Sequence, residues 1–494
     1  MTKKALFILM ALTLATGLFA IDVSTKVSLN FLSMADMPKD NDFVLGKINE
    51  KLLQDLNCEL KFTYLTWTDW QNRYALMLAS GEPMDAAYGA SWLNYYVQAK
   101  KGAFLALDDL LPKYAPVLNR LVPKAKWDGV KVGGKIYGVP RWDYNFVQRG
   151  FMYREDLRAK YKVPEIKSVD SMIAYLDAIK KNEPKMVGMT ESNWMAELII
   201  YVTKTKYQWI DGYDPYGATT GMLVADPSKP SELLSIFDLP EYKTLVTKMK
   251  ECADKGYWAK DILSYQGNPK TDFAAGLAAS QPSANPDGPP TPAATWATEH
   301  PDWKVGYYFY PDLNNTPQSS MPAQDVTVIL PRSKNPERAL MVVEKFLSDR
   351  SYFNLFMYGV EGRNYKVAAD GSLDNSWVPA EQKFGGVAMW CWLNRYFELP
   401  KKYGWEGRNA LLARLEKTLV PNPFSGFAID TTAVQAEAAA ITQVYNQYVK
   451  PLQTGLVANV DTALAQVKDR MKSAGFEKWK VEIQKQLQAW LKAK

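Results

Sequence analysis

The stretch TKVSLNFLS at residues 25–33 opens the part of the sequence that decides the fold. Apolar residues alternate along it, which is typical of a strand with one buried face. A second alternating stretch, CELKFTYL, occupies residues 58–65, and residues 42–56 between them carry apolar side chains four apart, as an amphipathic helix does. Strand, helix and strand of these lengths predict a βαβ unit with parallel strands and a right-handed crossover.

The following segments extend this unit into an α/β domain. Asp40 or Asn41 stands where it can cap the first helix. The apolar spacing then predicts a helix at about 69–80 and a short buried strand at 84–89. The glycine-rich segment GVKVGGKIYGVP at 129–140 contains no phosphate-binding motif, so we interpret it as a hairpin and an extended strand.

A second α/β unit is expected to begin near residue 150. A Pro/Gly-rich stretch at 281–292 is predicted to be a loop within it. Residues 406–494 are predicted to be helical throughout. The other predicted elements are a helix at 169–181, strands at 185–189, 304–311 and 325–330, and a helix at 336–348 that begins with Asn335-Pro336-Glu337.

Composition excludes several classes of protein. The 494 residues are 47% hydrophobic and 23% charged, which is typical of a soluble globular chain with more than one domain. Three distant cysteines (Cys58, Cys252 and Cys391) and a single histidine (His300) rule out a CxxC zinc site, a disulfide framework and a Ser-His-Asp triad. We therefore expect no metal site and no cofactor. The net charge of +6 is spread along the chain and does not indicate nucleic-acid binding.

Residues 1–20 are predicted to be a signal peptide. Two lysines precede an uncharged apolar run that ends at Ala20, and polar chain follows. The first cysteine is Cys58, so none stands at the expected cut to carry a lipid anchor. We expect a soluble chain outside the cytoplasm, retained in a periplasm.

Ligands of open parallel sheets bind beyond the carboxyl ends of the strands. The loops predicted there place an acid or a hydroxyl within a few residues of a Trp or Tyr. An aromatic ring covers the apolar face of a sugar, and a carboxylate accepts hydrogen bonds from its hydroxyls. Trp70, Trp479 and Trp490 lie on helical stripes and are expected in the core. The candidate ligand contacts are Asp36, Ser91, Trp92, Trp142, Asp143, Glu191, Trp194, Asp325 and Trp390.

Seven segments, in order along the chain, carry a resemblance to a known family. On these segments the chain resembles the extracellular solute-binding proteins, family 1, that serve ABC-type sugar importers, and its end is similar to the helical tail of a longer subgroup. The segments are DWQNRYALMLASGEPMDAAYG (69–89), GAFLALDDLLPKYAP (102–116), GGKIYGVP (133–140), FMYREDL (151–157), FAAGLAA (273–279), VTVILPRSKNPERALMVVEKFLSD (326–349) and YGVEGRNY (358–365).

The resemblance implies an α/β, two-lobed periplasmic-binding-protein-like (type II) fold with a hinge and a C-terminal helical extension. By analogy with the maltodextrin-binding branch, the first lobe would cover residues 21–140 and return at about 312–352. The second lobe would cover 141–311 and continue over 353–494.

The same analogy places ligand contacts at positions already named on the strand-end argument. These are Asp36, Ser91, Trp92, Trp142, Asp143, Glu191 and Trp194. Where the branch has a tryptophan-bearing loop, this chain has SQPSANPDGPPTP at 280–292, which adds Asp287 as a candidate and makes a long maltodextrin a poor fit.

The function implied by the resemblance is that of a non-enzymatic, monomeric receptor. It would capture a sugar or oligosaccharide by closing about segments 140–145 and 312–325, and deliver it to membrane permease subunits. An exported glycoside hydrolase needs only a carboxylate pair and an aromatic cleft, so it stays open. Signalling to a sensor, and a cationic or peptide solute held by Asp36, Asp143 and Glu191, also stay open.

Overall fold

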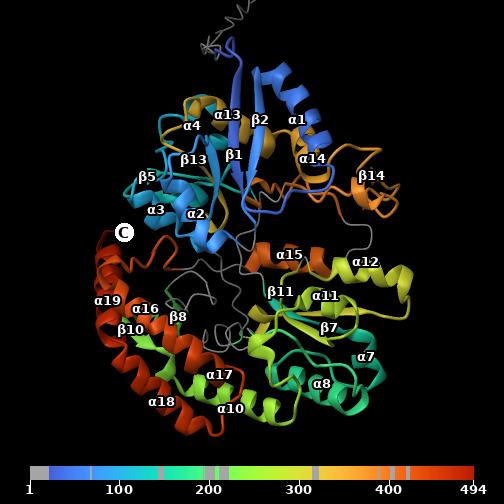
Figure 1. Cartoon of the computed structure of the whole chain (residues 1–494), viewed down its shortest axis with the longest axis vertical. Coiled ribbons are helices and arrows are strands. Elements are labelled where there is room, and N and C mark those ends of the chain that lie inside the picture. The colour runs from blue at the N-terminus through green and yellow to red at the C-terminus, as the bar shows by residue number, and fades with distance from the viewer. Residues whose placement is uncertain are drawn as a thin grey trace, which may run out of the picture.

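Two lobes with separate hydrophobic cores make up the protein, one above the other in Figure 1. This arrangement confirms the expected two-lobed α/β fold. None of the helices in the part described is long and apolar enough to cross a membrane. The computed structural model describes residues 22–66, 69–142, 149–192, 194, 198, 206–210, 222–286, 288–313, 322–387, 390–400, 407–418 and 423–493.

The first lobe is built on a five-stranded sheet. Strand β1 pairs in parallel with β2 and β3, and β13 pairs antiparallel with β3 and β6. Helix α1 (Asn41–Leu56) connects β1 to β2, so the predicted βαβ unit is confirmed. The strands in spatial order are β2 (Cys58–Tyr64), β1 (Val27–Ser33), β3 (Ala86–Gly89), β13 (Val326–Ile329) and β6 (Val139–Pro140).

The predicted cap of α1 is wrong in detail. Asp40 occupies the N-cap position, but its side chain makes no capping bond. Its carboxylate instead accepts hydrogen bonds from Arg363 at 2.8 and 2.9 Å and from Asn364 at 2.7 Å. The Asn41 amide oxygen accepts from the Tyr64 hydroxyl at 2.6 Å. The Arg363 guanidinium lowers the pKa of Asp40, because a neighbouring cation favours the charged carboxylate.

The segment from residue 353 to Trp392 belongs to the first lobe, so the expected boundary there is wrong. Helices α13 (Pro336–Ser348) and α14 (Arg350–Tyr358) pack on α1, and residues up to Trp392 share the same core. Trp392 is fully buried and stacks on Phe346, with ring centroids 4.5 Å apart. These aromatic contacts hold the segment against the first lobe.

Short helices and hairpins complete the first lobe. The glycine-rich segment forms the expected hairpin and extended strand. The remaining elements are α2 (Trp70–Ala79), the 3-10 turn Ser91–Leu93, α3 (Tyr95–Lys100), α4 (Leu111–Tyr114), α5 (Pro116–Leu121), α6 (Lys124–Asp128), β4 (Lys131–Val132), β5 (Lys135–Ile136), β14 (Lys366–Val367) and β15 (Leu373–Asp374).

The second lobe contains two three-stranded antiparallel sheets. One has the order β11 (Ser280–Ala284), β7 (Gly150–Arg154) and β12 (Val305–Phe309); the other has β10 (Lys229–Ser235), β9 (Leu223–Asp226) and β8 (Gln208–Trp209). The helices that pack beside them are α7 (Glu155–Lys160), α8 (Val169–Asn182), α10 (Pro240–Asp254), α11 (Pro269–Ala274) and α12 (Pro290–Glu299).

Two expectations for this lobe are corrected. Within the stretch predicted as a loop, residues 281–284 belong to β11 and residues 290–292 begin α12, and a register shift between Gln281 and Ala284 accommodates Pro282 in the strand. The expected strand at 185–189 is reduced to a single bridge between Val187 and Ala278.

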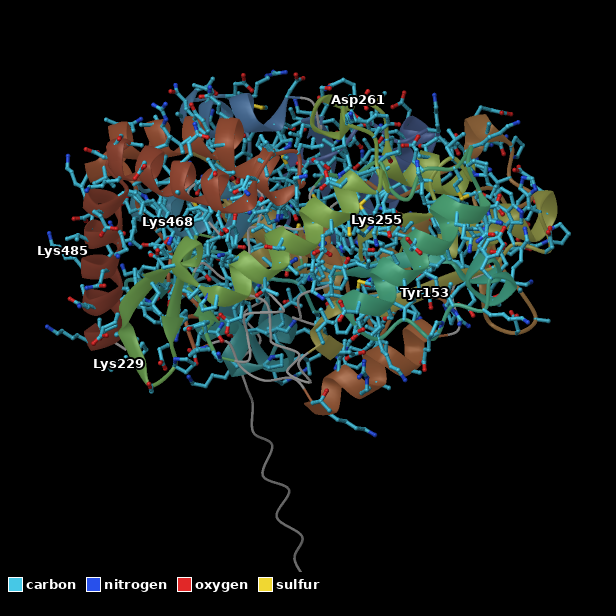
Figure 2. All side chains as sticks on the ribbon, turned by 90° about the horizontal axis from the view of Figure 1, so that it is seen from below. Tyr153, Lys229, Lys255, Asp261, Lys468 and Lys485 are labelled. Atoms are coloured by element: carbon cyan, nitrogen blue, oxygen red, sulfur yellow. The ribbon has the colours of Figure 1, made fainter. Side chains whose placement is uncertain are left out.

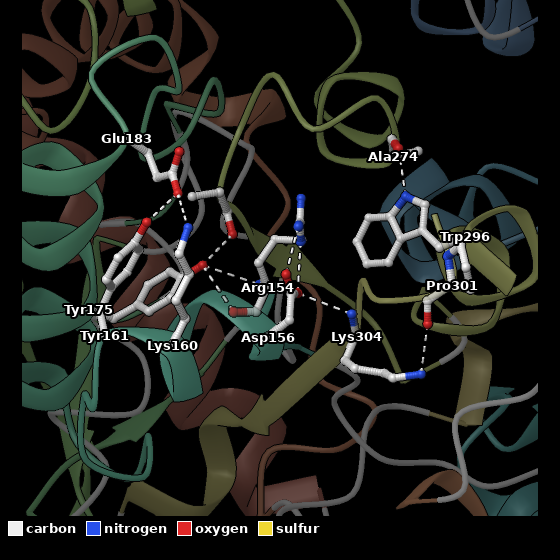
Figure 3. Close-up of polar contacts among 11 residues, drawn as sticks. Arg154, Asp156, Lys160, Tyr161, Tyr175, Glu183, Ala274, Trp296, Pro301 and Lys304 are labelled. Carbon is white, nitrogen blue, oxygen red and sulfur yellow. Dashed lines mark hydrogen bonds and ion pairs between the residues drawn. The ribbon is translucent and has the colours of Figure 1, made fainter. Parts of the chain in front are cut away.

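Arg154, the last residue of β7, connects this strand to α7 and to the segment before β12, as Figure 3 shows. Its guanidinium makes two hydrogen bonds to the Asp156 carboxylate at 2.8 and 2.7 Å and lies 3.6 Å from the centre of the Trp303 ring. Asp156 also accepts the Lys304 backbone N–H at 3.0 Å. This network fixes α7 to the start of β12 in the outer part of the second lobe.

The C-terminal helices are continuous with the second-lobe core. Ile441, Val467 and Ile483 share one buried cluster with Tyr242 and Met249 of α10. These helices are α16 (Gln435–Val444), a π-helical turn (Tyr445–Val449), α17 (Lys450–Gln453), α18 (Val460–Ser473) and α19 (Phe476–Ala493). Helix α15 (Gly407–Thr418) precedes them and forms a separate small cluster with Phe309 of β12.

The outward faces of α18 and α19 carry charged side chains, among them Lys468 and Lys485, labelled in Figure 2. Lys468 pairs with Asp238 at 2.7 Å, and Lys485 lies 3.9 Å from Glu482. These pairs are exposed to solvent and contribute little stability individually.

Replacing Trp392 by Ala should destabilise the first lobe. The substitution removes a fully buried ring from contacts with Phe346 and Phe356, and it should lower the free energy of unfolding by about 3–5 kcal/mol. Urea denaturation followed by circular dichroism measures this loss. The matched control is Trp377→Ala, because Trp377 is 41% exposed and its loss should be nearly neutral. Equal stability of both variants would contradict this account of the core.

Candidate ligand-binding face

The carboxyl ends of the parallel strands β1 and β2 point toward the second lobe in Figure 1. Loops that follow these strands therefore lie between the two lobes, where the strand-end rule places a ligand. The chain also passes from one lobe to the other in this region. The described residues before and after 143–148, 314–321 and 401–406 belong to different lobes, and we call these positions the first, second and third crossings.

Three tryptophan rings form what we call the aromatic wall, namely Trp70, Trp92 and Trp390, and the Tyr88 ring supports them from behind. Trp92 meets Trp70 edge to face at 5.3 Å and Tyr88 at 5.8 Å, while Trp390 meets Tyr88 edge to face at 6.1 Å. Tyr88 is fully buried behind the wall, Trp70 and Trp92 are half-buried, and Trp390 is 36% exposed. The wall therefore presents partly exposed tryptophan rings on a rigid base.

A short 3-10 turn (Trp390–Trp392) explains the orientation of Trp390. Trp392 donates its indole N–H to Thr327 Oγ1 at 2.7 Å, and the Thr327 hydroxyl donates to Cys391 Sγ at 3.3 Å. Both residues are thereby held inside the first lobe, and Trp390 is left facing outward. Burial raises the pKa of the Cys391 thiol, so this residue stays neutral.

A second aromatic pair lies at the crossing between the lobes. Trp142 contacts Tyr396 edge to face at 5.3 Å, and Tyr396 is 54% exposed. The Trp142 backbone N–H donates to the Leu393 carbonyl at 3.0 Å, and the Arg395 N–H donates to the Trp142 carbonyl at 3.1 Å. These two backbone hydrogen bonds thus join the segment before the first crossing to the segment before the third crossing, beside this aromatic pair.

Asp325 is reassigned by the structure from ligand contact to support of the hinge. It is buried, its Oδ2 lies 2.7 Å from Arg141 Nη1, and its Oδ1 accepts the Tyr88 hydroxyl. Both carboxylate oxygens therefore already have partners within the protein. Arg141 and Asp325 flank the first and second crossings, so their ion pair ties these crossings together.

Trp194 does not offer a platform in this conformation. It is 2% exposed and lies in the second-lobe core between Phe151, at 5.9 Å, and Trp258, at 6.2 Å. A sugar ring cannot cover an indole that is enclosed in this way. The sequence showed an aromatic after a predicted strand end but not how the second-lobe helices would enclose it.

The remaining predicted residues have mixed placements. Asp36 is exposed in the loop after β1, Ser91 starts the turn that carries Trp92, and Glu191 is half-buried beside Trp194. Asp143 and Asp287 lie outside the described residues.

Sequence reasoning missed Trp70, Tyr88 and Tyr396. Trp70 packs against the first-lobe core, as expected, and it also opens helix α2 at the same sheet edge as the end of β2. Its position directly after a strand end was a usable signal. Tyr396 falls in WCWLNRYF at 390–397, where the density of aromatics was a second signal.

This face suits an uncharged ligand that has flat apolar faces. Its side chains are mainly aromatic, and the buried charges of Arg141 and Asp325 neutralise each other. Within the described ranges, no group of three or more His, Cys, Asp or Glu could hold a metal ion.

Comparison with known proteins confirms the resemblance to substrate-binding proteins. A carbohydrate ABC transporter substrate-binding protein of Streptococcus pneumoniae is 22% identical over 506 residues, which cover 96% of this chain and 93% of that protein. The fructooligosaccharide-binding protein FusA of the same organism is 29% identical over 33% of this chain and 32% of its own. Residues 423–492 match a family described as a domain of unknown function (DUF3502).

Solved structures share the two-lobed fold over nearly the whole chain. The N-glycan transport solute-binding protein NgtS of Streptococcus pneumoniae, in complex with Man1GlcNAc, superposes with a TM-score of 0.73 at 20% identity, covering 94% of this chain and 100% of that one. The alginate-binding protein AlgQ2 superposes with a TM-score of 0.64 at 17% identity, covering 94% and 99%.

Substituting Arg141 by Ala should destabilise the protein strongly. The change leaves the buried Asp325 carboxylate without its cation, and breaking such a pair costs about 3–5 kcal/mol. The double variant Arg141→Met/Asp325→Leu removes both charges and should recover most of the loss. Urea denaturation of the three proteins measures the effect, and a single variant as stable as the wild type would refute a buried, coupled pair.

Proposed function

We propose that this chain is an exported substrate-binding protein of an ABC importer, which captures a sugar or short oligosaccharide between its lobes and delivers it to permease subunits. The observation that carries this proposal is the aromatic wall at the carboxyl end of the first-lobe sheet, directly beside the crossings. The similarity to carbohydrate-binding proteins over nearly the whole chain supports the same function.

Stacking on aromatic rings would supply the binding energy. Trp92 and Trp390 would cover the apolar faces of sugar rings from the first lobe, and the Trp142–Tyr396 pair would do so at the crossing. Asp36, Ser91 and Glu191 would accept or donate hydrogen bonds at the rim. Asp143 and Asp287 stay predictions from the sequence.

Closure of the lobes would then follow from contacts that exist only in the closed form. Raising the closed population from 1% to 99% requires about 5.5 kcal/mol of preference for that form. Two stacked rings and several hydrogen bonds to hydroxyls would together contribute a binding free energy of this order. The closed protein, as a monomer, is the form that would dock on the permease.

The expected signal peptide at residues 1–20 would direct the chain to the periplasm.

We further propose that the protein has no enzymatic activity of its own. The rival function, a glycoside hydrolase, requires two carboxylates facing one bound sugar.

A thermal melt against mono- and oligosaccharides tests the function directly. A ligand present at a hundred times its Kd should stabilise the protein by about 2.7 kcal/mol. The panel should include mannosyl-N-acetylglucosamine and kestose, and mass spectrometry should recover the sugar intact. Recovery of a cleaved sugar would support the hydrolase instead, whereas a panel without any shift would contradict sugar binding.

The aromatic wall is tested by single substitutions measured by calorimetric titration with the sugar that gives the largest shift. Trp92→Ala and Trp390→Ala should each weaken binding about 10- to 100-fold, or about 1.4–2.8 kcal/mol, because each removes a stacking surface. Trp377→Ala is the matched control, since Trp377 is an exposed tryptophan that packs beside Lys366 near β14. Wild-type affinity in both wall variants would overturn the site.

A further inference from the structure

We propose that Tyr88 is a positioning residue that couples the aromatic wall to the hinge, an inference that rests on the proposed function. Its ring contacts Trp92 at 5.8 Å and Trp390 at 6.1 Å, and its hydroxyl donates to Asp325. One side chain therefore touches both the residues that would stack on sugar and the ion pair that ties the crossings.

The Tyr88 ring is well placed to transmit a displacement. The backbone of β3 is held on both sides, because β3 pairs with β1 and with β13. Tyr88 is fully buried, so its ring has little freedom except to follow its aromatic neighbours. A rotation of Trp92 or Trp390 onto a sugar would therefore tilt the Tyr88 ring.

The hydroxyl of Tyr88 is a permanent donor. Burial and the nearby Asp325 carboxylate raise the pKa of this hydroxyl well above its ordinary value, so it stays protonated. When the ring tilts, the Asp325 carboxylate has to follow or lose this bond. Losing it would leave a buried carboxylate with fewer donors, which is costly.

Asp325 passes the displacement to the crossings. Its other oxygen binds Arg141, and the Arg141 backbone N–H also donates to the Asp325 carbonyl at 3.4 Å. Arg141 directly precedes Trp142, which is hydrogen-bonded to Leu393 and Arg395 in the segment ahead of the third crossing. A shift of Asp325 therefore reaches all three crossings at the first-lobe end of the hinge.

The test is Tyr88→Phe with Tyr74→Phe as its matched control. Both variants remove one buried tyrosine hydroxyl from the same region, but only Tyr88→Phe removes the bond to Asp325. Spin labels at Glu50→Cys in the first lobe and Lys181→Cys in the second report the distance between lobes. The three native cysteines are buried and should not be labelled.

We expect Tyr88→Phe to broaden the distribution of distances without ligand and to reduce the shortening caused by saturating mannosyl-N-acetylglucosamine or kestose. Its affinity for the bound probe should fall about tenfold while both tryptophans remain. Tyr74→Phe should match the wild type in all three measurements. Asp325→Asn, which keeps the shape of the side chain, is the second variant and should broaden the distribution as Tyr88→Phe does.

These measurements distinguish the proposed coupling by Tyr88 from a purely structural role of this residue. If Tyr88→Phe melts at a lower temperature but shows the wild-type distance distribution and closure, the coupling is refuted. If neither probe shortens the distance in the wild type, the proposed binding of these sugars fails. The ligand-free comparison of Tyr88→Phe with Tyr74→Phe then still decides the coupling, since equal distributions would overturn it.

Discussion

The ion pair between Arg141 and Asp325 is the interaction on which the arrangement of the two lobes depends. Both residues are buried at the first-lobe end of a crossing. Trp142, which follows Arg141, is in turn hydrogen-bonded to Leu393, so the pair and this bond connect all three segments of the first lobe that lead to the crossings. An ion pair in such a place adds little net stability relative to apolar side chains of the same volume. The contribution of the pair is positional, because its 2.7 Å contact holds residue 141 next to residue 325.

The aromatic wall depends on support from the first-lobe core, and the ion pair contributes to it through the Tyr88 hydroxyl. Tryptophans that remain partly exposed need a rigid support, or they collapse onto one another and lose the surface they offer. Tyr88 and the turn at Trp390–Trp392 provide that support from the first-lobe core. The outward ring of Trp390 and the inward ring of Trp392 are thus two ends of one structural unit.

Local sequence patterns predicted the elements whose cause is local. The period-two strands and the four-residue spacing between them fixed the βαβ unit, and Asn335-Pro336-Glu337 marked the start of α13, which spans Pro336–Ser348. The errors have a common physical origin in contacts between distant segments. Asp40 is bound by Arg363 from far along the chain, and β11 tolerates its proline because β7 lies beside it.

The candidate site was predictable only in part for the same reason. Trp92 and Trp390 are candidates from their positions in the chain, and the structure leaves both rings partly exposed. Asp325 and Trp194 have the right residue types, but their burial depends on Arg141 and on Trp258, which no nearby pattern reveals. Residue type identifies candidates, whereas long-range packing decides which of them remain accessible.

The C-terminal helices share one core with the second lobe, and this has an evolutionary consequence. Trp258 donates its indole N–H to the Thr454 carbonyl at 3.1 Å, and Ile441 and Ile483 fill the same interior as α10. A segment joined in this way is not a portable module. Its loss would remove about a third of the buried residues in the second-lobe cluster, so a deletion of the tail could be accepted only together with substitutions that rebuild that interior.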